Sequence, residues 1–258
     1  KGGITMSTMS VGRGMFNMYS HIASGKRIHS AADDAAGLAI AKRMKREETG
    51  LNVGAQNAQM GIAALNVADG ALGGVTDYLQ RIRDLAVRSM NGINSPSDKA
   101  IYQREIDQMK QGIQSLAEGT SLNEQKLLDG SMADLELVTN PSGGSRRIQM
   151  ANTTLEALGI ADLDVTSEDF SLDAIDKALD MVSAQRGSLG ASTNGLEYSY
   201  NYNTSASLQQ LKSRSSLEDL DLPKAVSEKQ KKELLFQYQT FMMKKKMEEE
   251  EKTNKLLF

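Results

Sequence analysis

The stretch IDKALDMVSAQRGSLGASTNGL, residues 175–196, carries an apolar side chain at every seventh position. The first seam position is held by Ile175, Val182, Leu189 and Leu196, and the second by Leu172 and Leu179. Two apolar positions in every seven residues give a mean repeat of 3.5 residues, which is typical of α-helices that wind around each other. One amphipathic helix cannot bury its own apolar stripe. The stretch therefore predicts partner helices, either elsewhere in the chain or on another copy of it.

Three further segments show the same mixture of three- and four-residue steps. Their apolar residues are Val11, Met15, Met18 and Ile22; Ile62, Leu65, Leu72, Val75, Leu79, Ile82 and Leu85; and Tyr102, Ile106, Met109, Ile113 and Leu116. We expect helices near residues 8–23, 31–49, 56–91, 97–118, 171–212 and 222–255. The predicted fold is mainly α, a long antiparallel coiled coil or helical bundle.

One region departs from the helical period. In LLDGSMADLELVTNPSGGSRRIQM, residues 127–150, Leu135 and Leu137 alternate with polar residues, a PSGG turn follows, and Ile148 and Met150 alternate again. A period of two on both sides of a turn predicts a β-hairpin. We expect a further extended piece at residues 158–165.

Composition excludes several classes of protein. The 258 residues carry a net charge of −3, which disfavours a nucleic-acid-binding protein. Without cysteine there is no disulfide framework or thiolate site. No apolar run is long enough for a membrane span, and no signal peptide is recognisable.

The sequence offers no catalytic, metal or cofactor site. His21 and His29 are the only histidines, and eight positions separate them, too many for both to reach one metal from one helix. The glycine-rich GALGG, residues 70–74, lies in a helical run without the strand and turn of a phosphate loop. We therefore expect no enzyme.

The segment SGKRIHSAADDAAGLAIAKRM, residues 24–44, places two acids in an alanine-rich run after a glycine. We expect Ser30 to cap a helix and Asp33 to occupy its first turn, where an acid favours the positive helix end. The alanines leave thin helix faces that neighbouring helices can approach closely.

The same segment resembles the N-terminal signature of bacterial flagellins. The resemblance continues in GLNVGAQNAQMGIAALNVADGAL (50–72), LQRIRDLAVRSMNG (79–92), EIDQMKQGIQSLAEGTSLNEQKLLDG (105–130) and IDKALDMVSAQRGSLGASTNGLEYSYNYNTS (175–205). It covers nearly the whole chain. Only residues 159–170 remain for the variable outer domain, so the chain resembles a minimal flagellin.

The resemblance implies a structural subunit that assembles into the flagellar filament for motility. It implies a discontinuous terminal-helix domain, residues 1–30 with 215–258, and an outer helical domain, residues 31–214, with the β-hairpin near 127–165. The terminal helices would be mobile in the free subunit and would pair as the inner tube of the filament. The residues expected to mediate self-assembly are Val11, Met15, Met18, Ile22, Leu234, Tyr238, Phe241, Leu256 and Leu257.

The resemblance also implies partners other than the chain itself. These are a flagellar export chaperone, cap and junction proteins, and the animal Toll-like receptor that recognises flagellin. The receptor-contact motif matches at Arg81, Leu85 and Glu105. Leu85 also fits the core heptad, so packing is its alternative role. Secretion through the flagellar type III pathway, without a cleaved signal peptide, is implied as well.

Two features depart from the family pattern. Glu218 stands where the family usually has Arg, and the tail KKKMEEEE, residues 244–251, replaces small polar residues. In this tail lysine precedes glutamate, the weaker order for pairs within a helix. The tail is either a solvated face or a surface for a channel or partner. The alternative functions are a hook–filament junction protein and a secreted coiled-coil binding module.

Overall fold

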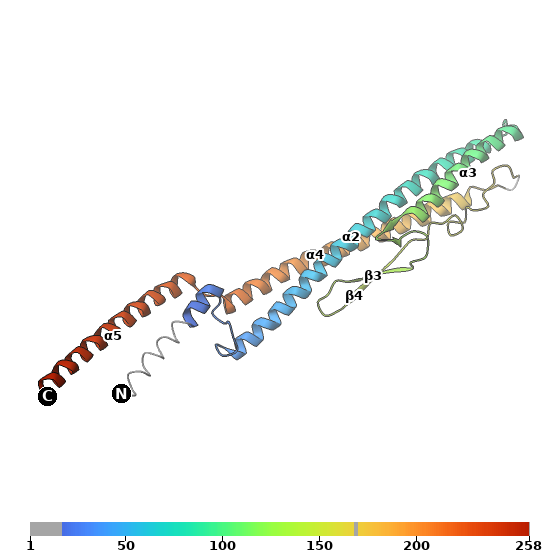
Figure 1. Ribbon diagram of the computed structural model, residues 1–258. Coiled ribbons are helices and arrows are strands. Elements are labelled where there is room, and N and C mark those ends of the chain that lie inside the picture. The colour runs from blue at the N-terminus through green and yellow to red at the C-terminus, as the bar shows by residue number, and fades with distance from the viewer. Residues whose placement is uncertain (1–16, 168–169, 258) are drawn as a thin grey trace. The chain divides into compact units, whose positions relative to one another are not determined.

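The computed structural model describes residues 17–167 and 170–257, and the side chains of Glu250 and of residues 253–257 are not described. The chain is mainly helical, as predicted (Figure 1). Residues 17–24 are helical, and the long helices are α2 (Ala35–Ser89), α3 (Pro96–Gly119), α4 (Asp173–Glu218) and α5 (Leu222–Leu257). The strands are β1 (Ser121–Leu122), β2 (Gln125–Lys126), β3 (Asp134–Val138) and β4 (Ser145–Gln149).

The chain forms two compact units. One, the terminal unit, contains Lys1–Glu48 and Leu208–Phe258, and the other, the central unit, contains Thr49–Ser207. The predicted domain boundaries at residues 30 and 215 refer to the layers of an assembled filament. The two units of the single chain do not test them, so they stay a prediction.

The core of the central unit is formed by the predicted heptads. Within this unit α2, α3 and α4 lie side by side (Figure 1). Ile175, Val182, Leu189 and Leu196 of α4 are at most 1% exposed, and they pack in one cluster with the stripe of α2 from Leu65 to Leu85. From α3, Ile106 and Ile113 complete the cluster. Burial of these apolar side chains is the main stabilising term of the unit.

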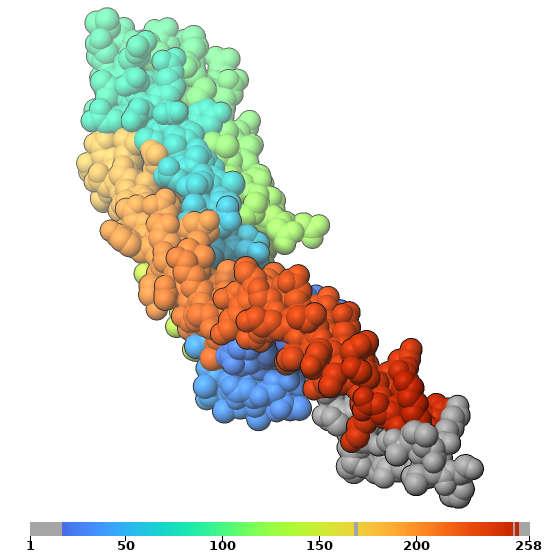
Figure 2. All heavy atoms as spheres, turned by 90° about the vertical axis from the view of Figure 1, so that its left-hand side faces the viewer, coloured from blue at the N-terminus to red at the C-terminus, as the bar shows by residue number. Residues whose placement is uncertain are grey.

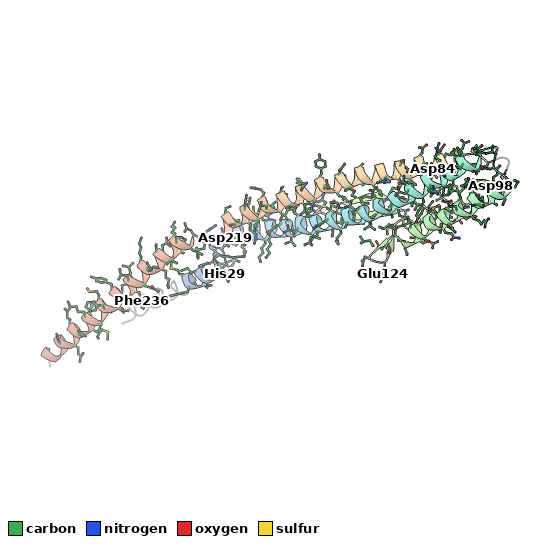
Figure 3. All side chains as sticks on the ribbon, turned by 90° about the horizontal axis from the view of Figure 1, so that it is seen from above. His29, Asp84, Asp98, Glu124, Asp219 and Phe236 are labelled. Carbon is green, nitrogen blue, oxygen red and sulfur yellow. The ribbon has the colours of Figure 1, made fainter. Side chains whose placement is uncertain are left out.

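Local sequence signals set the limits of α3. Ser95 and Asp98 form a capping box, in which each side chain accepts a hydrogen bond from the other residue's backbone N–H. After α3, Asn123 and Glu124 have φ of 49° and 67° in the two-residue turn between β1 and β2. A tight hairpin turn requires this left-handed conformation. Asp98 of the capping box and Glu124 of the hairpin turn are labelled in Figure 3.

The hairpin predicted within residues 127–150 is confirmed. Strands β3 and β4 are antiparallel, with Leu135 opposite Ile148 and Leu137 opposite Arg146. Ile148 is 3% exposed, and Leu135 and Leu137 pack against the central core. The alternation therefore turns one face of the hairpin toward the helices.

The prediction of separate helices at 31–49 and 56–91 is wrong, since α2 is continuous from Ala35 to Ser89. Gly50 and Gly54, between the two predicted segments, lie inside the helix where the hairpin approaches it. A Cβ on Gly54 would lie 2.5 Å from the Thr139 carbonyl oxygen, and one on Gly50 would lie 2.6 Å from Pro141 Cβ. The glycines lower helix propensity. Here they allow a close approach of the hairpin.

The extended piece expected at residues 158–165 is also wrong. Its apolar residues Leu158, Ile160, Leu163 and Val165 are buried, as strand residues would be, but the backbone forms turns. The Ile160 N–H donates to the Leu155 carbonyl, and Gly159 has a φ of +70°. These local hydrogen bonds satisfy the backbone without a neighbouring strand.

Candidate assembly surfaces

Helix α5 begins at a cap that the sequence encodes locally. The Asp221 side chain accepts a hydrogen bond from the Lys224 N–H, and Pro223 occupies the first turn, where its missing N–H costs nothing. Ala225, one turn later, is 7% exposed. Only this first turn of α5 contains a buried residue among its described side chains.

One side of α5 faces the helical segment 17–24. The Tyr19 hydroxyl donates a 2.5 Å hydrogen bond to Glu233 Oε1, and Lys229 Nζ lies 4.5 Å from the centre of the Tyr19 ring. The hydroxyl, helped by Lys229, lowers the pKa of Glu233 below its ordinary value. On the same side Phe236 is half-buried. These contacts join the two terminal segments of the chain.

The opposite side of α5 is apolar and exposed. Leu234, Tyr238 and Phe241 are 62–68% exposed, and Leu235 and Met242 lie beside them. At 3.6 residues per turn the five side chains span about 120° of the helix circumference. We call Leu234, Leu235, Tyr238, Phe241 and Met242 the α5 apolar face. The surface of α5 is drawn in red in Figure 2, and side chains around Phe236 are shown in Figure 3.

The predicted self-assembly residues are only partly described. Val11 and Met15 lie outside the described residues. Met18 and Ile22 are half-buried, whereas the three predicted residues of the α5 apolar face are exposed. Leu256 and Leu257 belong to α5, but their side chains are not described.

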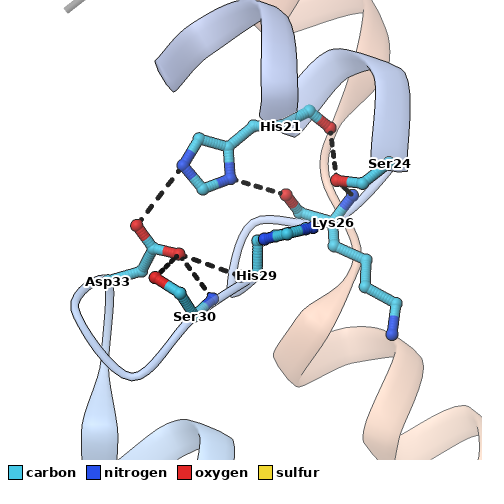
Figure 4. Close-up of polar contacts among 6 residues, drawn as sticks. All are labelled: His21, Ser24, Lys26, His29, Ser30 and Asp33. Carbon is cyan, nitrogen blue, oxygen red and sulfur yellow. Dashed lines mark hydrogen bonds and ion pairs between the residues drawn. The ribbon is translucent and has the colours of Figure 1, made fainter. Parts of the chain in front are cut away.

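The residue that caps α2 differs from the one that the sequence predicted. Helix α2 is capped by Asp34, whose Oδ1 accepts from the Gly37 N–H at 2.8 Å, and not by Ser30. Asp33 lies outside the helix. Its Oδ2 accepts from the N–H groups of His29 and Ser30 at 3.0 and 2.8 Å (Figure 4). These donors lower the pKa of Asp33 below its ordinary value, with the Ser30 N–H contributing most.

Both ring nitrogens of His21 face oxygen atoms. Nδ1 lies 3.0 Å from the Lys26 carbonyl oxygen, and Nε2 lies 3.4 Å from Asp33 Oδ1 (Figure 4). His21 therefore has polar neighbours in the loop that follows the helical segment 17–24. The described residues contain no group of three or more acidic or histidine side chains suited to a metal ion.

The loop is anchored to the end of α4. The Arg27 N–H donates to the Glu218 carbonyl oxygen at 2.6 Å, and Ile28 is 1% exposed. The Glu218 carboxylate, itself buried, pairs with Lys26 at 3.3 Å and with Arg214 at 3.6 Å. A buried carboxylate needs such partners. Glu218, which stands where the family usually has Arg, therefore forms ion pairs within the chain.

The predicted receptor-contact residues lie on α2 and α3 of the central unit. Arg81 Nη2 is 2.6 Å from Glu105 Oε1, so the two charged side chains form an ion pair on the surface. Leu85 is 1% exposed and packs in the core. In this conformation Leu85 therefore has the packing role that was its alternative, and it holds the helix that carries Arg81. Its contact with the receptor stays a prediction.

Exposed aromatic residues on α4 were not anticipated from the sequence. Tyr198 and Tyr202 are 79% and 70% exposed. Their four-residue spacing puts them on one side of α4, away from the heptad that contains Leu196. The sequence could have indicated their exposure, because neither tyrosine occupies a position of the apolar heptad.

Two family models match this chain. The model of the bacterial flagellin N-terminal helical region matches residues 6–133, and that of the C-terminal helical region matches residues 172–248. This chain belongs to the bacterial flagellin family. Flagellins are structural subunits of the flagellar filament, not enzymes. The unmatched part between the two regions holds the β3–β4 hairpin and the turns that follow, so this flagellin has almost no outer domain.

Individual relatives agree with the family models. A flagellin of Listeria innocua is 32% identical over 252 residues, which cover 89% of this chain and 87% of the relative. The crystal structure of Bacillus cereus flagellin matches with a TM-score of 0.52 and 25% identity, covering 57% of this chain and 88% of that one. A hook-associated flagellar protein from Vibrio parahaemolyticus shares the fold, with a TM-score of 0.61 at 18% identity, covering 72% and 100% of the two chains.

Proposed function

We propose that this flagellin polymerises through the α5 apolar face together with the N-terminal apolar residues Val11, Met15, Met18 and Ile22. The observation that carries the proposal is the exposure of Leu234, Tyr238 and Phe241, three large apolar side chains on one side of a helix. Burying a side chain of this kind contributes about 1.5–3 kcal/mol. Contiguous exposed apolar side chains mark interaction surfaces in soluble proteins.

Whether subunits form a closed oligomer or a filament depends on whether their contacts join like or unlike surfaces. If the subunits add head to tail in one direction, each contact joins two different surfaces. Contacts of this heterologous type do not close when the rotation between subunits leaves the chain open, and they then generate helical polymers. Motility is the purpose that the family supports for such a filament.

Electron microscopy of the purified protein, with and without a seeding salt, tests the proposal. The wild type is expected to form long, uniform filaments, and Phe241→Gln is expected to lengthen the lag or abolish polymerisation. Gln239→Ala is the matched control, because Gln239 is exposed on the same helix but outside the α5 apolar face. Filaments of Phe241→Gln that form as fast as those of the wild type would contradict the proposal.

A second proposal concerns recognition by the animal Toll-like receptor for flagellin. The exposed Arg81 and the half-buried Glu105 form an ion pair across α2 and α3, and the buried Leu85 packs beneath the helix that carries Arg81. Arg81→Ala is expected to weaken receptor binding, whereas Arg104→Ala, next to Glu105 but on another side of α3, is expected to leave it unchanged. Equal affinities of wild type and Arg81→Ala would rule the site out.

Export through the flagellar type III pathway, without a cleaved signal peptide, and contacts with an export chaperone and with cap and junction proteins, are proposals that family membership supports. The described helices include none that is long and apolar enough to cross a membrane.

Two alternative functions are weaker. For a hook–filament junction protein, a hook-associated flagellar protein shares the fold, but both flagellin family models match this chain. A secreted coiled-coil binding module would stay monomeric where a filament subunit polymerises.

A further inference from the structure

The seam that contains the α5 apolar face continues into charged residues on both sides. Going along the helix in steps of three and four, Lys231 comes before Leu234, Tyr238 and Phe241, and Lys245 and Glu248 follow them. All six positions lie on one side of α5. Lys231, Lys245 and Glu248 are exposed, as are the apolar residues between them. A second helix that covers the apolar residues would also meet these charges.

A parallel pair of two α5 helices would be disfavoured by these charges. In a parallel pair in register, each seam residue meets its own copy, so that Lys231 meets Lys231, Lys245 meets Lys245 and Glu248 meets Glu248. Like charges at such close range destabilise the contact. Shifting one helix by seven residues places Phe241 against Glu248, which removes the charge from water without a partner.

An antiparallel pair satisfies both the apolar and the charged positions. When the two helices cross between Gln239 and Thr240, the seam pairs Tyr238 with Phe241 of the other copy and Leu234 with Lys245. The aliphatic part of a lysine side chain can cover a leucine while its ammonium group stays in water. At the next layer outward Lys231 meets Glu248, and each of these contacts occurs twice because the pair is symmetric.

We infer that the α5 apolar face binds a second copy of this chain in an antiparallel, two-fold symmetric helix pair. The other side of α5 remains engaged by Tyr19 through Glu233 and Lys229, so the pair leaves the terminal unit intact. A two-fold contact uses the same surface on both copies and closes on itself. It therefore differs from any contact within a polar filament, and the pair is a state of the free subunit that occludes the α5 apolar face.

Charge exchange tests the orientation, with sedimentation velocity of the full-length protein in low salt, below the concentration at which filaments form. Lys231→Glu and Glu248→Lys are each expected to raise the dimer dissociation constant about tenfold, because two attractive contacts become repulsive in each variant. The double variant Lys231→Glu/Glu248→Lys is expected to return to the wild-type value. The two positions are 17 residues apart, too far for contact within one helix.

The controls separate this result from other causes. Lys232→Glu changes the same net charge outside the seam and is expected to leave the dissociation constant within about twofold of the wild type. Circular dichroism checks that helicity is unchanged in each variant. A protein that stays monomeric up to millimolar concentration, or a dimer that neither single variant weakens, would overturn the inference.

Distances provide an independent test. The chain has no cysteine, so one introduced cysteine carries a unique spin label. In the antiparallel pair two labels at Gln239 lie close together, whereas two labels at Glu228 are about 35 Å apart along the helix axis at 1.5 Å rise per residue. A parallel pair would give similar short distances at both sites and would refute the model. Filament formation is scored separately by microscopy, so a failure to polymerise leaves this result unaffected.

Discussion

Asp33 and Asp34 are neighbours in the sequence, but they stabilise different structures. Asp34 caps α2 through the Gly37 N–H, and Asp33 closes the preceding loop through the N–H groups of His29 and Ser30. A helix cap and a loop closure need the same chemistry, a short acceptor near free N–H groups. The two roles can therefore be separated by substitution.

Asp34→Ala is expected to lower the free energy of unfolding by about 1 kcal/mol, because the first turn of α2 loses its cap. Thermal or denaturant unfolding of the protein measures the difference. Ser30→Ala, which removes the cap that the sequence predicted, should cost less, since the Ser30 side chain caps no helix in this structure. A larger loss for Ser30→Ala would restore the original assignment.

Asp33 makes the loop sensitive to acid. Its pKa is below the ordinary 3.8 because the Ser30 and His29 N–H groups stabilise the carboxylate. The stabilisation is fully present above pH 3.8 and is lost as the pH falls through the lower folded-state pKa. The amide resonances of His29 and Ser30 are expected to shift in that acid range. In Asp33→Asn they should show no transition in that acid range, and an acid transition of the same size in this variant would contradict the account.

Helix α2 and the β3–β4 hairpin depend on each other at the scale of elements. Besides the glycine contacts, Asn57 Nδ2 donates to the Val138 carbonyl and Asn203 Nδ2 donates to the Thr139 carbonyl, both at 2.8 Å. These bonds satisfy the carbonyl groups of the last residue of β3 and of the residue that follows it. The hairpin is therefore held against two helices by backbone contacts as well as by its apolar face.

Gly54→Ala is expected to destabilise the central unit by about 1–3 kcal/mol, because the new methyl group would overlap the Thr139 carbonyl. Gly70→Ala on the same helix is the matched control. Nothing lies within 4 Å of a Cβ at Gly70, so that substitution should stabilise the helix by roughly 0.5–1 kcal/mol. Denaturant unfolding gives both values. Stabilisation by both substitutions would show that the hairpin does not pack at Gly54.

At the scale of the whole molecule the two units differ in how much they bury. The central unit contains a continuous apolar core, whereas the described side chains of α5 beyond its first turn are exposed or half-buried. Helix stability in proteins comes mostly from packing of an apolar face. The free subunit therefore combines a stable centre with a terminal helix whose stability depends on association.

Hydrogen exchange measures this difference. In the free subunit the amides of residues 230–255 are expected to exchange on the order of a hundredfold faster than those of the α2 core between Leu65 and Leu85. In the filament the same amides should become protected, because association buries the α5 apolar face. Full protection of 230–255 in the dilute monomer would show that α5 is stable without a partner.

The sequence alone determined which segments are helical, although it divided α2 in two, and it determined the β3–β4 hairpin and the apolar side of α5. Heptads such as Ile175 to Leu196 and the alternation around Leu135 and Ile148 specify which side of an element is apolar, because helix and strand periods are local properties. Only the tertiary structure decided what each side meets. It showed that the hairpin contacts α2 at Gly54, and that Leu85 is buried although Arg81 on the same helix is exposed. It also showed that Tyr19 contacts one side of α5 while Phe241 on the other side stays exposed. Such contacts join residues far apart in the chain, and no local period specifies them.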